Sequence, residues 1–290
     1  MNLLLTPRAF VRRRLLGPFG ARPSPLAGRT VLITGASSGI GESTARAVCS
    51  RGAHALLVAR RAEELERVRA EIEAAGGVAS AYTCDLTDAA STDALVARLL
   101  AEHGAVDMLV NNAGRSIRRS LEYSYDRMHD FERTMAINYF GPVRLILGLL
   151  PAMREQRFGH VVNIVTWGVQ IKAPRFAAYI ASKTALDTFS RIAGREAYAD
   201  NVTFTNIRLS LVRTDMISTV EAYRKAPAKS PQQAAALVVR ALEDRPLTIS
   251  TAVGNVSEVL NLVAPRLMDW AASSASRRFP DSAAAKGEAG

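Results

Sequence analysis

The chain has 290 residues, of which 48% are hydrophobic and 22% are charged, a composition that excludes an intrinsically disordered protein. Its two cysteines, Cys49 and Cys84, are too few for a disulfide framework or a cysteine-only zinc site, and no metal site is expected. Lysine and arginine outnumber acidic residues by 37 to 27, so the formal net charge is +10 and an anionic partner is favoured. Nucleic acid is not the expected partner, because no basic patch is interleaved with aromatic residues.

Residues 1–27 form a basic and apolar N-terminal extension with no acidic residue. Within it, Asn2 to Leu16 either forms an amphipathic helix that lies on a membrane or on the domain, or is a mobile extension. The apolar run from Leu3 to Leu5 precedes the arginines, the reverse of a secretory signal, and no run approaches the ~18 apolar residues of a membrane span. We expect a cytoplasmic protein whose N-terminus can contact a membrane peripherally.

From Arg29 onward, short apolar runs alternate with longer helical periods. Strands are predicted at 30–33, 54–59, 79–84, 108–111, 160–165, 202–209 and 247–252, and helices at 41–51, 61–75, 88–103, 125–154 and 179–199. This alternation over residues 28–252 predicts an α/β fold with a doubly wound parallel β-sheet and helices on both faces. In residues 253–290, an apolar stretch interrupted by Pro265 predicts two short helices, followed by a frayed tail.

A glycine-rich turn follows the first predicted strand, where residues 34–41 read TGASSGIG. Glycine allows the backbone to turn tightly and approach a pyrophosphate, and the helix that follows supplies free N–H groups for the anion. The turn therefore predicts a dinucleotide-binding loop. The residues expected to contact the cofactor are Gly35, Ser37, Ser38, Gly39, Ile40 and Gly41.

The end of the second predicted strand indicates which cofactor is bound. An acidic residue there would bind the ribose 2′-hydroxyl of NAD, but this strand ends at Ala59 and is followed by Arg60 and Arg61. Two guanidinium groups suit a 2′-phosphate. Alternatively, the two arginines are solvated residues at the start of the next helix. We therefore expect NADPH/NADP+ as the cofactor.

Tyr179 and Lys183 are four residues apart in a predicted helix, which places both side chains on one face. A tyrosine with a pKa near ~10 is a poor acid–base group at neutral pH. A nearby ammonium, together with the positive nicotinamide of an oxidised cofactor, would lower that pKa. Taken alone, the pair could equally be an ordinary surface helix pair.

The pair does not stand alone, because Asp85-Leu86, Asn111 to Gly114 and Asn138 precede it in an order that resembles the short-chain dehydrogenase/reductase family from Leu26 to Ala252. The resemblance implies a Rossmann fold and hydride transfer with a nicotinamide cofactor. It implies that Tyr179 donates the proton, that Lys183 holds the nicotinamide ribose and that Asn138 anchors a water of the proton relay. The further cofactor contacts that it implies are Asp85, Leu86, Asn112, Ala113, Gly114, Val212 and Thr214.

One position departs from the family pattern. The family usually has a serine thirteen residues before the tyrosine, and this chain has Thr166 there. Threonine keeps the hydroxyl that would bond the substrate carbonyl, but its methyl group restricts χ1 and crowds the pocket. We predict that Thr166 takes the role of the serine.

A closer resemblance is to bacterial long-chain fatty acyl-CoA reductases of this superfamily. It is carried by the segments 111–119, 130–135, 138–141, 211–214, 245–246 and 279–283. It implies that the substrate is an acyl-CoA and the product a fatty aldehyde. Arg115, Arg118 and Arg119 would then meet the phosphates of CoA, unless they are ordinary surface charge.

The same resemblance leaves other activities open. A ketone or 3-oxoacyl reductase, or an alcohol dehydrogenase, would use the same tyrosine, lysine and hydroxyl group. A catalytically idle nucleotide-binding scaffold is a more remote alternative. The resemblance also implies a homodimer or a homotetramer.

Overall fold

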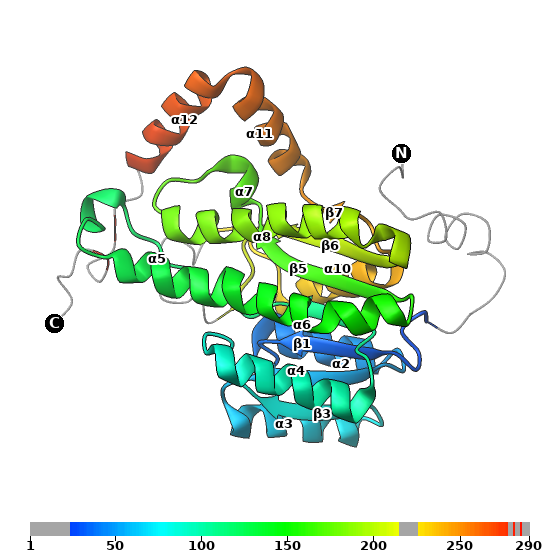
Figure 1. Cartoon of the computed structure of the whole chain (residues 1–290). Coiled ribbons are helices and arrows are strands. Elements are labelled where there is room, and N and C mark those ends of the chain that lie inside the picture. The colour runs from blue at the N-terminus through cyan, green and yellow to red at the C-terminus, as the bar shows by residue number, and fades with distance from the viewer. Residues whose placement is uncertain (1–23, 215–225, 278–280, 282–284, 286–290) are drawn as a thin grey trace.

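The fold is built on one seven-stranded parallel sheet. The computed structural model describes residues 24–214, 226–277, 281 and 285. The strands are β1 (Thr30–Thr34), β2 (His54–Ala59), β3 (Val78–Thr83), β4 (Met108–Asn111), β5 (Gly159–Thr166), β6 (Val202–Leu209) and β7 (Thr248–Ile249). Their order across the sheet is β3-β2-β1-β4-β5-β6-β7, and every neighbouring pair is parallel (Figure 1). The predicted Rossmann-type α/β fold is therefore confirmed. The segment from Asn2 to Leu16, for which the sequence left an amphipathic helix and a mobile extension open, lies outside the described residues.

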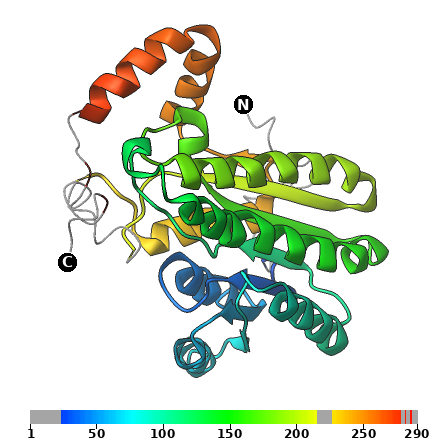
Figure 2. The ribbon, with the colours of Figure 1, turned by 60° about the vertical axis from the view of Figure 1, so that its left-hand side comes forward.

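Helices cover both faces of the sheet (Figure 2). One face carries α2 (Gly39–Cys49), α3 (Ala62–Ala74) and α10 (Pro231–Asp244), and the other carries α4 (Ala89–His103), α6 (Gly141–Glu155) and α8 (Ala177–Glu196). Side chains alternate between the two cores along each strand, as in β1, where Val31 and Ile33 face one core and Leu32 faces the other. Both faces of the sheet are thus buried, as a parallel sheet requires.

The chain order creates a crevice at the carboxyl edge of the sheet. After β3, the chain returns across the sheet to place β4 on the opposite side of β1 from β2. The connections that leave β1 and β4 therefore run to opposite faces, and ligands bind at such a switch point in open α/β sheets.

A continuous helix from Met128 to Glu155 contains α5 (Met128–Met135), a π-helical turn η2 (Ala136–Phe140) and α6. Pro142 has no N–H to donate to the carbonyl of Asn138, which interrupts the regular hydrogen-bond ladder beside the π turn. Among the described residues, this helix alone has the length and composition of a membrane span. In α6, however, Leu145, Ile146 and Leu149 are buried in the core to which α4 also contributes, as in a core helix of a globular protein.

The chain after β6 departs from the sequence prediction at α10, a helix that was not predicted, and at β7. Strand β7 has two residues instead of the predicted 247–252, because Thr251 caps the next helix by accepting a hydrogen bond from the N–H of Gly254 at 3.0 Å. The two predicted helices follow as α11 (Ala252–Val263) and α12 (Pro265–Arg277). The remaining short elements are η1 (Leu121–Tyr123), α7 (Gly168–Ile171) and η3 (Tyr198–Asp200).

A buried row of polar side chains crosses three adjacent strands. Asn111 of β4 donates to Asn163 of β5 at 2.9 Å, and Asn163 donates to Asn206 of β6 at 3.3 Å. Asn206 in turn donates to the carboxylate of Asp187 on α8 at 2.9 Å, and Arg208 binds the same carboxylate at 2.9 Å. Because these groups are buried, their hydrogen bonds help to fix the packing of α8 on the sheet.

Candidate active site

A large cleft opens at the carboxyl edge of the sheet, with a volume of about 1330 Å³. It is bounded by the glycine-rich turn and by residues that follow β2, β4, β5 and β6. Its volume exceeds the ~300–1,000 Å³ of a typical small-molecule pocket. The cleft therefore has room for a dinucleotide and a second molecule.

The glycine-rich turn leaves its backbone uncovered toward this cleft. Gly35 and Gly39 have positive φ angles of +66° and +58°. A Cβ on Gly35 would lie 3.0 Å from the Nδ2 of Asn112, and a Cβ on Gly39 would lie 3.2 Å from a methyl carbon of Thr214. Asn112 supports the turn by donating to the carbonyl of Thr34 at 2.9 Å. Bare peptide groups of this kind fit a pyrophosphate, and the contact itself stays a prediction.

Most residues of the predicted cofactor site line this cleft. Those found in its wall are Gly35, Ser37, Ser38, Gly39, Ile40, Arg60, Arg61, Leu86, Asn112, Ala113, Gly114, Tyr179, Lys183, Val212 and Thr214. Gly41 lies beneath the turn instead, against the carbonyl group of Gly35. Asp85 is turned toward its own loop, where it accepts hydrogen bonds from the N–H and hydroxyl of Thr87 at 2.9 and 2.8 Å.

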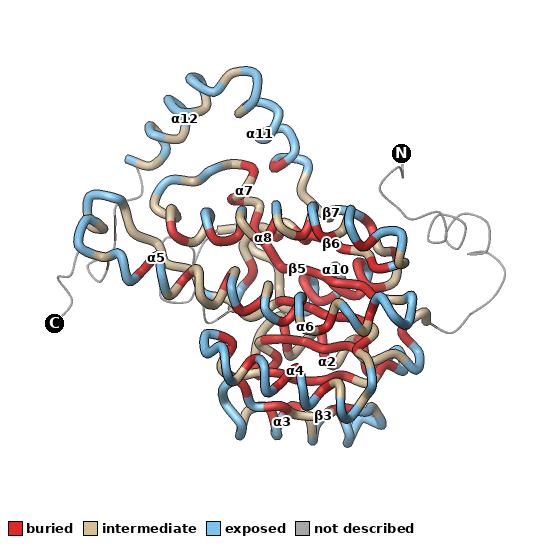
Figure 3. The backbone as a smooth tube through the Cα atoms, viewed as in Figure 1, coloured by how far each residue is buried: buried red, intermediate tan, exposed pale blue. Residues whose placement is uncertain are grey.

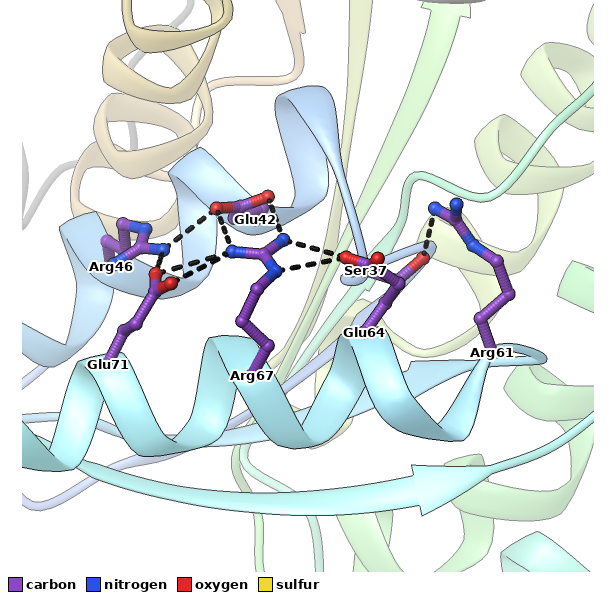
Figure 4. Close-up of polar contacts among 7 residues, drawn as sticks. All are labelled: Ser37, Glu42, Arg46, Arg61, Glu64, Arg67 and Glu71. Atoms are coloured by element: carbon purple, nitrogen blue, oxygen red, sulfur yellow. Dashed lines mark hydrogen bonds and ion pairs between the residues drawn. The ribbon is translucent and has the colours of Figure 1, made fainter.

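The two arginines after β2 lie at one end of the cleft. Arg61 donates to the hydroxyl of Ser37 in the glycine-rich turn at 3.1 Å, and Arg60 is 72% exposed with Asp85 3.9 Å away. Figure 4 shows that Arg67, six residues after Arg61 and on α3, binds the carboxylates of Glu42, Glu64 and Glu71. Arg60 and Arg61, by contrast, precede α3 and line the cleft.

Thr166 and Tyr179 meet in the cleft wall. Thr166 ends β5, and its hydroxyl oxygen accepts a hydrogen bond from the N–H of Gly168 at 3.1 Å. A Cβ on Gly168 would lie only 3.2 Å from the Thr166 methyl, so a glycine at this position leaves room for that methyl. Burial raises the pKa of Tyr179 to about 12, and its hydrogen bond with Thr166 opposes this shift. The phenol is therefore protonated at neutral pH.

Lys183 is 4% exposed, and its ammonium donates to the carbonyl of Ile164 at 2.8 Å. Its burial lowers its pKa to about 8. That this ammonium, together with an oxidised nicotinamide, lowers the pKa of Tyr179 stays a prediction. The lysine is directed at the strand end because β5 and α8 pack directly against each other.

Asn138 lies beneath the cleft wall in the π turn. It accepts from the N–H of Arg115 and donates to the carbonyl of the same residue, both at 2.8 Å, and it donates to Ser182 at 2.9 Å. A Cβ on Gly114 would lie 2.9 Å from the Oδ1 of Asn138 and 3.3 Å from the Nζ of Lys183. Glycine at 114 therefore keeps the approach to both polar groups open.

The three arginines predicted to bind substrate do not all lie at the cleft. Arg115 lines the cleft, whereas Arg118 and Arg119 are absent from the wall that the described residues form. Arg119 is directed instead to the buried carboxylate of Asp130 at 3.4 Å and to the carbonyl of Ala285. The loop after β4 turns back there, since the N–H of Arg119 is bonded to the carbonyl of Arg175.

Two further arginines in the cleft wall, Arg133 and Arg213, were missed by the sequence analysis. Arg133 comes from α5 and also contacts Asp130, and only the three-residue spacing of this pair could have suggested it. An apolar end of the cleft was missed as well. It is formed by Trp167, Ile171, Phe176 and Ile180, which come from the segment between β5 and α8 and from the start of α8. No residue of α11 or α12 lines the cleft.

No metal-binding cluster accompanies this site within the described residues, where no three His, Cys, Asp or Glu side chains gather.

Comparisons with known proteins agree with the geometry. A sequence profile described as short chain dehydrogenase matches residues 29–225. The chain is 48% identical to a fatty acyl-CoA reductase of Acinetobacter baylyi, over 90% of this chain and 88% of that protein.

Two other proteins are similar to this chain over most of their own length. An uncharacterized oxidoreductase of Mycobacterium tuberculosis is 46% identical, over 99% of this chain and 87% of that protein. Among solved structures, a metagenomic short-chain oxidoreductase in complex with NADP matches with a TM-score of 0.68 and 31% identity, over 78% of this chain and 97% of the other.

Proposed function

The chain belongs to the short-chain dehydrogenase family of oxidoreductases, and we propose that it is an NADPH-dependent reductase that converts a long-chain fatty acyl-CoA to a fatty aldehyde. The observation that carries the substrate class is the 48% identity to a fatty acyl-CoA reductase over 90% of this chain. The wall of the cleft supports it, because arginines and an apolar end suit a molecule with phosphates and an alkyl chain.

Two hydroxyl groups would act on the carbonyl oxygen of the substrate. NADPH supplies a hydride when bound, and negative charge then develops on that oxygen. The neutral phenol of Tyr179 can donate a proton or a strong hydrogen bond to it. The Thr166 hydroxyl already accepts from Gly168, so its own hydrogen is available to Tyr179 or to the substrate.

For a thioester substrate, the tetrahedral oxyanion held by Thr166 and Tyr179 collapses with cleavage of the carbon–sulfur bond. The products are an aldehyde and CoA thiolate, which takes a proton from water or from the enzyme. Lys183 would hold the nicotinamide ribose, because its ammonium lies beside the open position at Gly114. Asn138 would support Tyr179 indirectly, because it donates to the hydroxyl of Ser182, which in turn donates to the carbonyl of Tyr179 at 2.7 Å.

The preference for NADPH over NADH rests on Arg60 and Arg61. A charge-assisted contact to a 2′-phosphate contributes about 1.5–3 kcal/mol. We expect the double change Arg60→Ala and Arg61→Ala to lower kcat/KM for NADPH at least about tenfold, with little change for NADH. Arg69→Ala is the matched control, because this arginine lies on α3, the helix that follows Arg60 and Arg61, and pairs with Glu66 and Glu73. Equal losses with both cofactors would contradict the assignment.

The substrate class is tested by product analysis. Purified protein is incubated with NADPH and acyl-CoAs of increasing chain length, and free CoA thiol and aldehyde are measured beside NADPH oxidation. We expect one thiol and one aldehyde per NADPH, and efficiency that rises with chain length, because each buried CH₂ contributes up to ~0.8 kcal/mol. Rapid reduction of ketones or 3-oxoacyl esters without thiol release would favour the ketone reductase alternative.

We also propose a homo-oligomer formed through α6 and α8. Phe140, Leu147 and Ile192 are 60%, 57% and 52% exposed on this side of the molecule. Sedimentation velocity of the parent and of Leu147→Glu tests this: a dimer or tetramer that dissociates in the variant is expected. A parent that stays monomeric at micromolar concentration contradicts the proposal.

A further inference from the structure

Helices α11 and α12, here called the C-terminal hairpin, carry an unusual number of exposed apolar side chains. Eight of the seventeen large hydrophobic side chains that are exposed among the described residues belong to it. They are Val253, Val256, Val259, Leu260, Leu262, Val263, Leu267 and Trp270. Figure 3 shows the hairpin as mostly exposed, in contrast to the buried strands of the sheet. These residues therefore contribute little to the core.

The contacts that hold the hairpin to the body are largely polar. On α11, Asn255 and Glu258 accept hydrogen bonds from Gln170 at 3.0 and 2.9 Å, and Glu258 also pairs with Arg208. At the end of α12, Arg175 donates to the carbonyl of Ser276 at 2.7 Å. A surface helix of a globular protein normally turns its apolar side to the core and its polar side to water. Helix α11 shows the reverse arrangement, and α12 has no buried residue on any side.

The shape of the hairpin indicates what covers its apolar side. Figures 1 and 2 show that the two helices project from the body and meet at a tip. The tip carries Leu262 and Val263, which are 82% and 68% exposed, and Leu267, which is 57% exposed. A projecting apolar tip can enter a fluid lipid surface, whereas contact with another protein would need a matching recess.

Charge and aromatic placement agree with a lipid surface. Arg266 and Arg277 of α12 are exposed, as is Lys172 at the end of α7, the helix on which α11 packs. The acids of the hairpin, Glu258 and Asp269, are both exposed, and Glu258 is paired with Arg208. Tryptophan, here Trp270, favours the boundary between headgroups and acyl chains. Basic residues near that boundary attract anionic headgroups.

We propose that the C-terminal hairpin is a membrane-docking element that inserts its apolar tip into a bilayer with anionic headgroups. Docking would set the apolar end of the cleft close to the bilayer, since Ile171 of α7 lines that end and α11 packs on α7. This membrane contact is independent of which carbonyl compound the cleft accepts, and it is distinct from any contact made by residues 1–23.

The test is flotation of the full-length protein with vesicles of phosphatidylcholine alone and with 30% phosphatidylglycerol. The test variant is Leu262→Glu plus Leu267→Glu, and the matched control is Val78→Glu plus Tyr198→Glu, which places two acids at sites that are 57% and 66% exposed outside the hairpin. We expect the parent and the control to bind anionic vesicles, and the test variant to bind at least tenfold more weakly. Reductase activity without vesicles and the circular dichroism spectrum should be alike in all three.

A second measurement does not depend on charge reversal. A polarity-sensitive dye attached at Leu262→Cys should shift to shorter emission wavelength when anionic vesicles are added, and the same dye at Val78→Cys should not. Cys49 and Cys84 are buried and remain unlabelled. Unchanged binding of the test variant would overturn the proposal and assign vesicle contact to another part of the chain. Self-association without vesicle binding, lost in the test variant, would overturn it in favour of an interface between copies.

Discussion

The substitution Gly41→Ala tests the cofactor-binding turn most directly. Gly41 is in the first turn of α2, where alanine would ordinarily stabilise a helix by up to ~1 kcal/mol. Here a Cβ would overlap the carbonyl oxygen of Gly35 and lie 2.7 Å from both the carbonyl carbon of Gly35 and the Nδ2 of Asn112. That distance is about 0.7 Å short of the 3.4 Å at which ordinary contact begins. The turn or the helix must therefore move.

The expected cost is about 1–3 kcal/mol of stability, as for overpacking elsewhere in protein cores. Displacing the turn by several tenths of an ångström also disturbs the bare peptide groups that would hold the pyrophosphate. We expect the Kd for NADPH to rise at least about tenfold, which corresponds to ~1.4 kcal/mol. Thermal unfolding reports the first effect and calorimetric titration with NADPH reports the second.

Gly194→Ala is the matched control, because Gly194 also lies in a helix. A Cβ there would be 3.3 Å from side-chain atoms of Phe204 and would face no backbone of the turn. We expect the Kd for NADPH to stay within about twofold in this control. A Gly41→Ala protein with the parent's stability and the parent's affinity for NADPH would refute this account of the turn.

Three further outcomes are expected. Burial, assisted by the positive charge of Arg245, lowers the pKa of His160 to about 3, so below pH 6.5 the unfolded chain binds a proton that the folded chain does not; relative to His160→Gln, the parent should lose about 1.6 kcal/mol of stability between pH 6.5 and 5. Asp187→Asn removes the carboxylate that binds Arg208 and should cost about 3 kcal/mol in chemical denaturation. Tyr179→Phe should lower kcat at least about 10²-fold while the Kd for NADPH stays within about twofold.

Each of these expectations has a control and a contradicting result. For His160, a difference from the variant that does not change with pH would show that the ring titrates equally in both states. For Asp187, the control is Asp93→Asn, whose exposed pair with Arg144 should be worth less than ~1 kcal/mol. Equal costs at the two positions would contradict a special role for the buried pair. For Tyr179, substantial turnover of the phenylalanine variant would mean that another group donates the proton.

The sequence alone was sufficient for the features that depend on neighbours along the chain. Apolar runs of strand length alternating with helical periods determined the parallel sheet, because such runs can only be buried between two layers of helices. The turn at residues 34–41 follows from glycine chemistry at a strand-to-helix junction. The four-residue spacing of Tyr179 and Lys183 places both on one face of a helix, and the structure puts both in the wall of the cleft.

Only the tertiary structure decided how charged and polar side chains are partnered. Arg115, Arg118 and Arg119 are alike in sequence, yet Arg119 is directed to Asp130 because the loop after β4 folds back against Arg175. The asparagine row that begins at Asn111 depends on the order of strands in the sheet, which brings residues 52 and 43 positions apart into contact.

The C-terminal hairpin shows most clearly what the sequence predicts and what only the tertiary structure decides. Its two apolar helices were predicted from periodicity and from Pro265, and both are present. Periodicity cannot say which side of an apolar helix meets the core, because that depends on what the rest of the chain leaves uncovered. Here Gln170 and Arg208 bind polar side chains of α11, so the polar side of that helix is held inward and its apolar side is left outward.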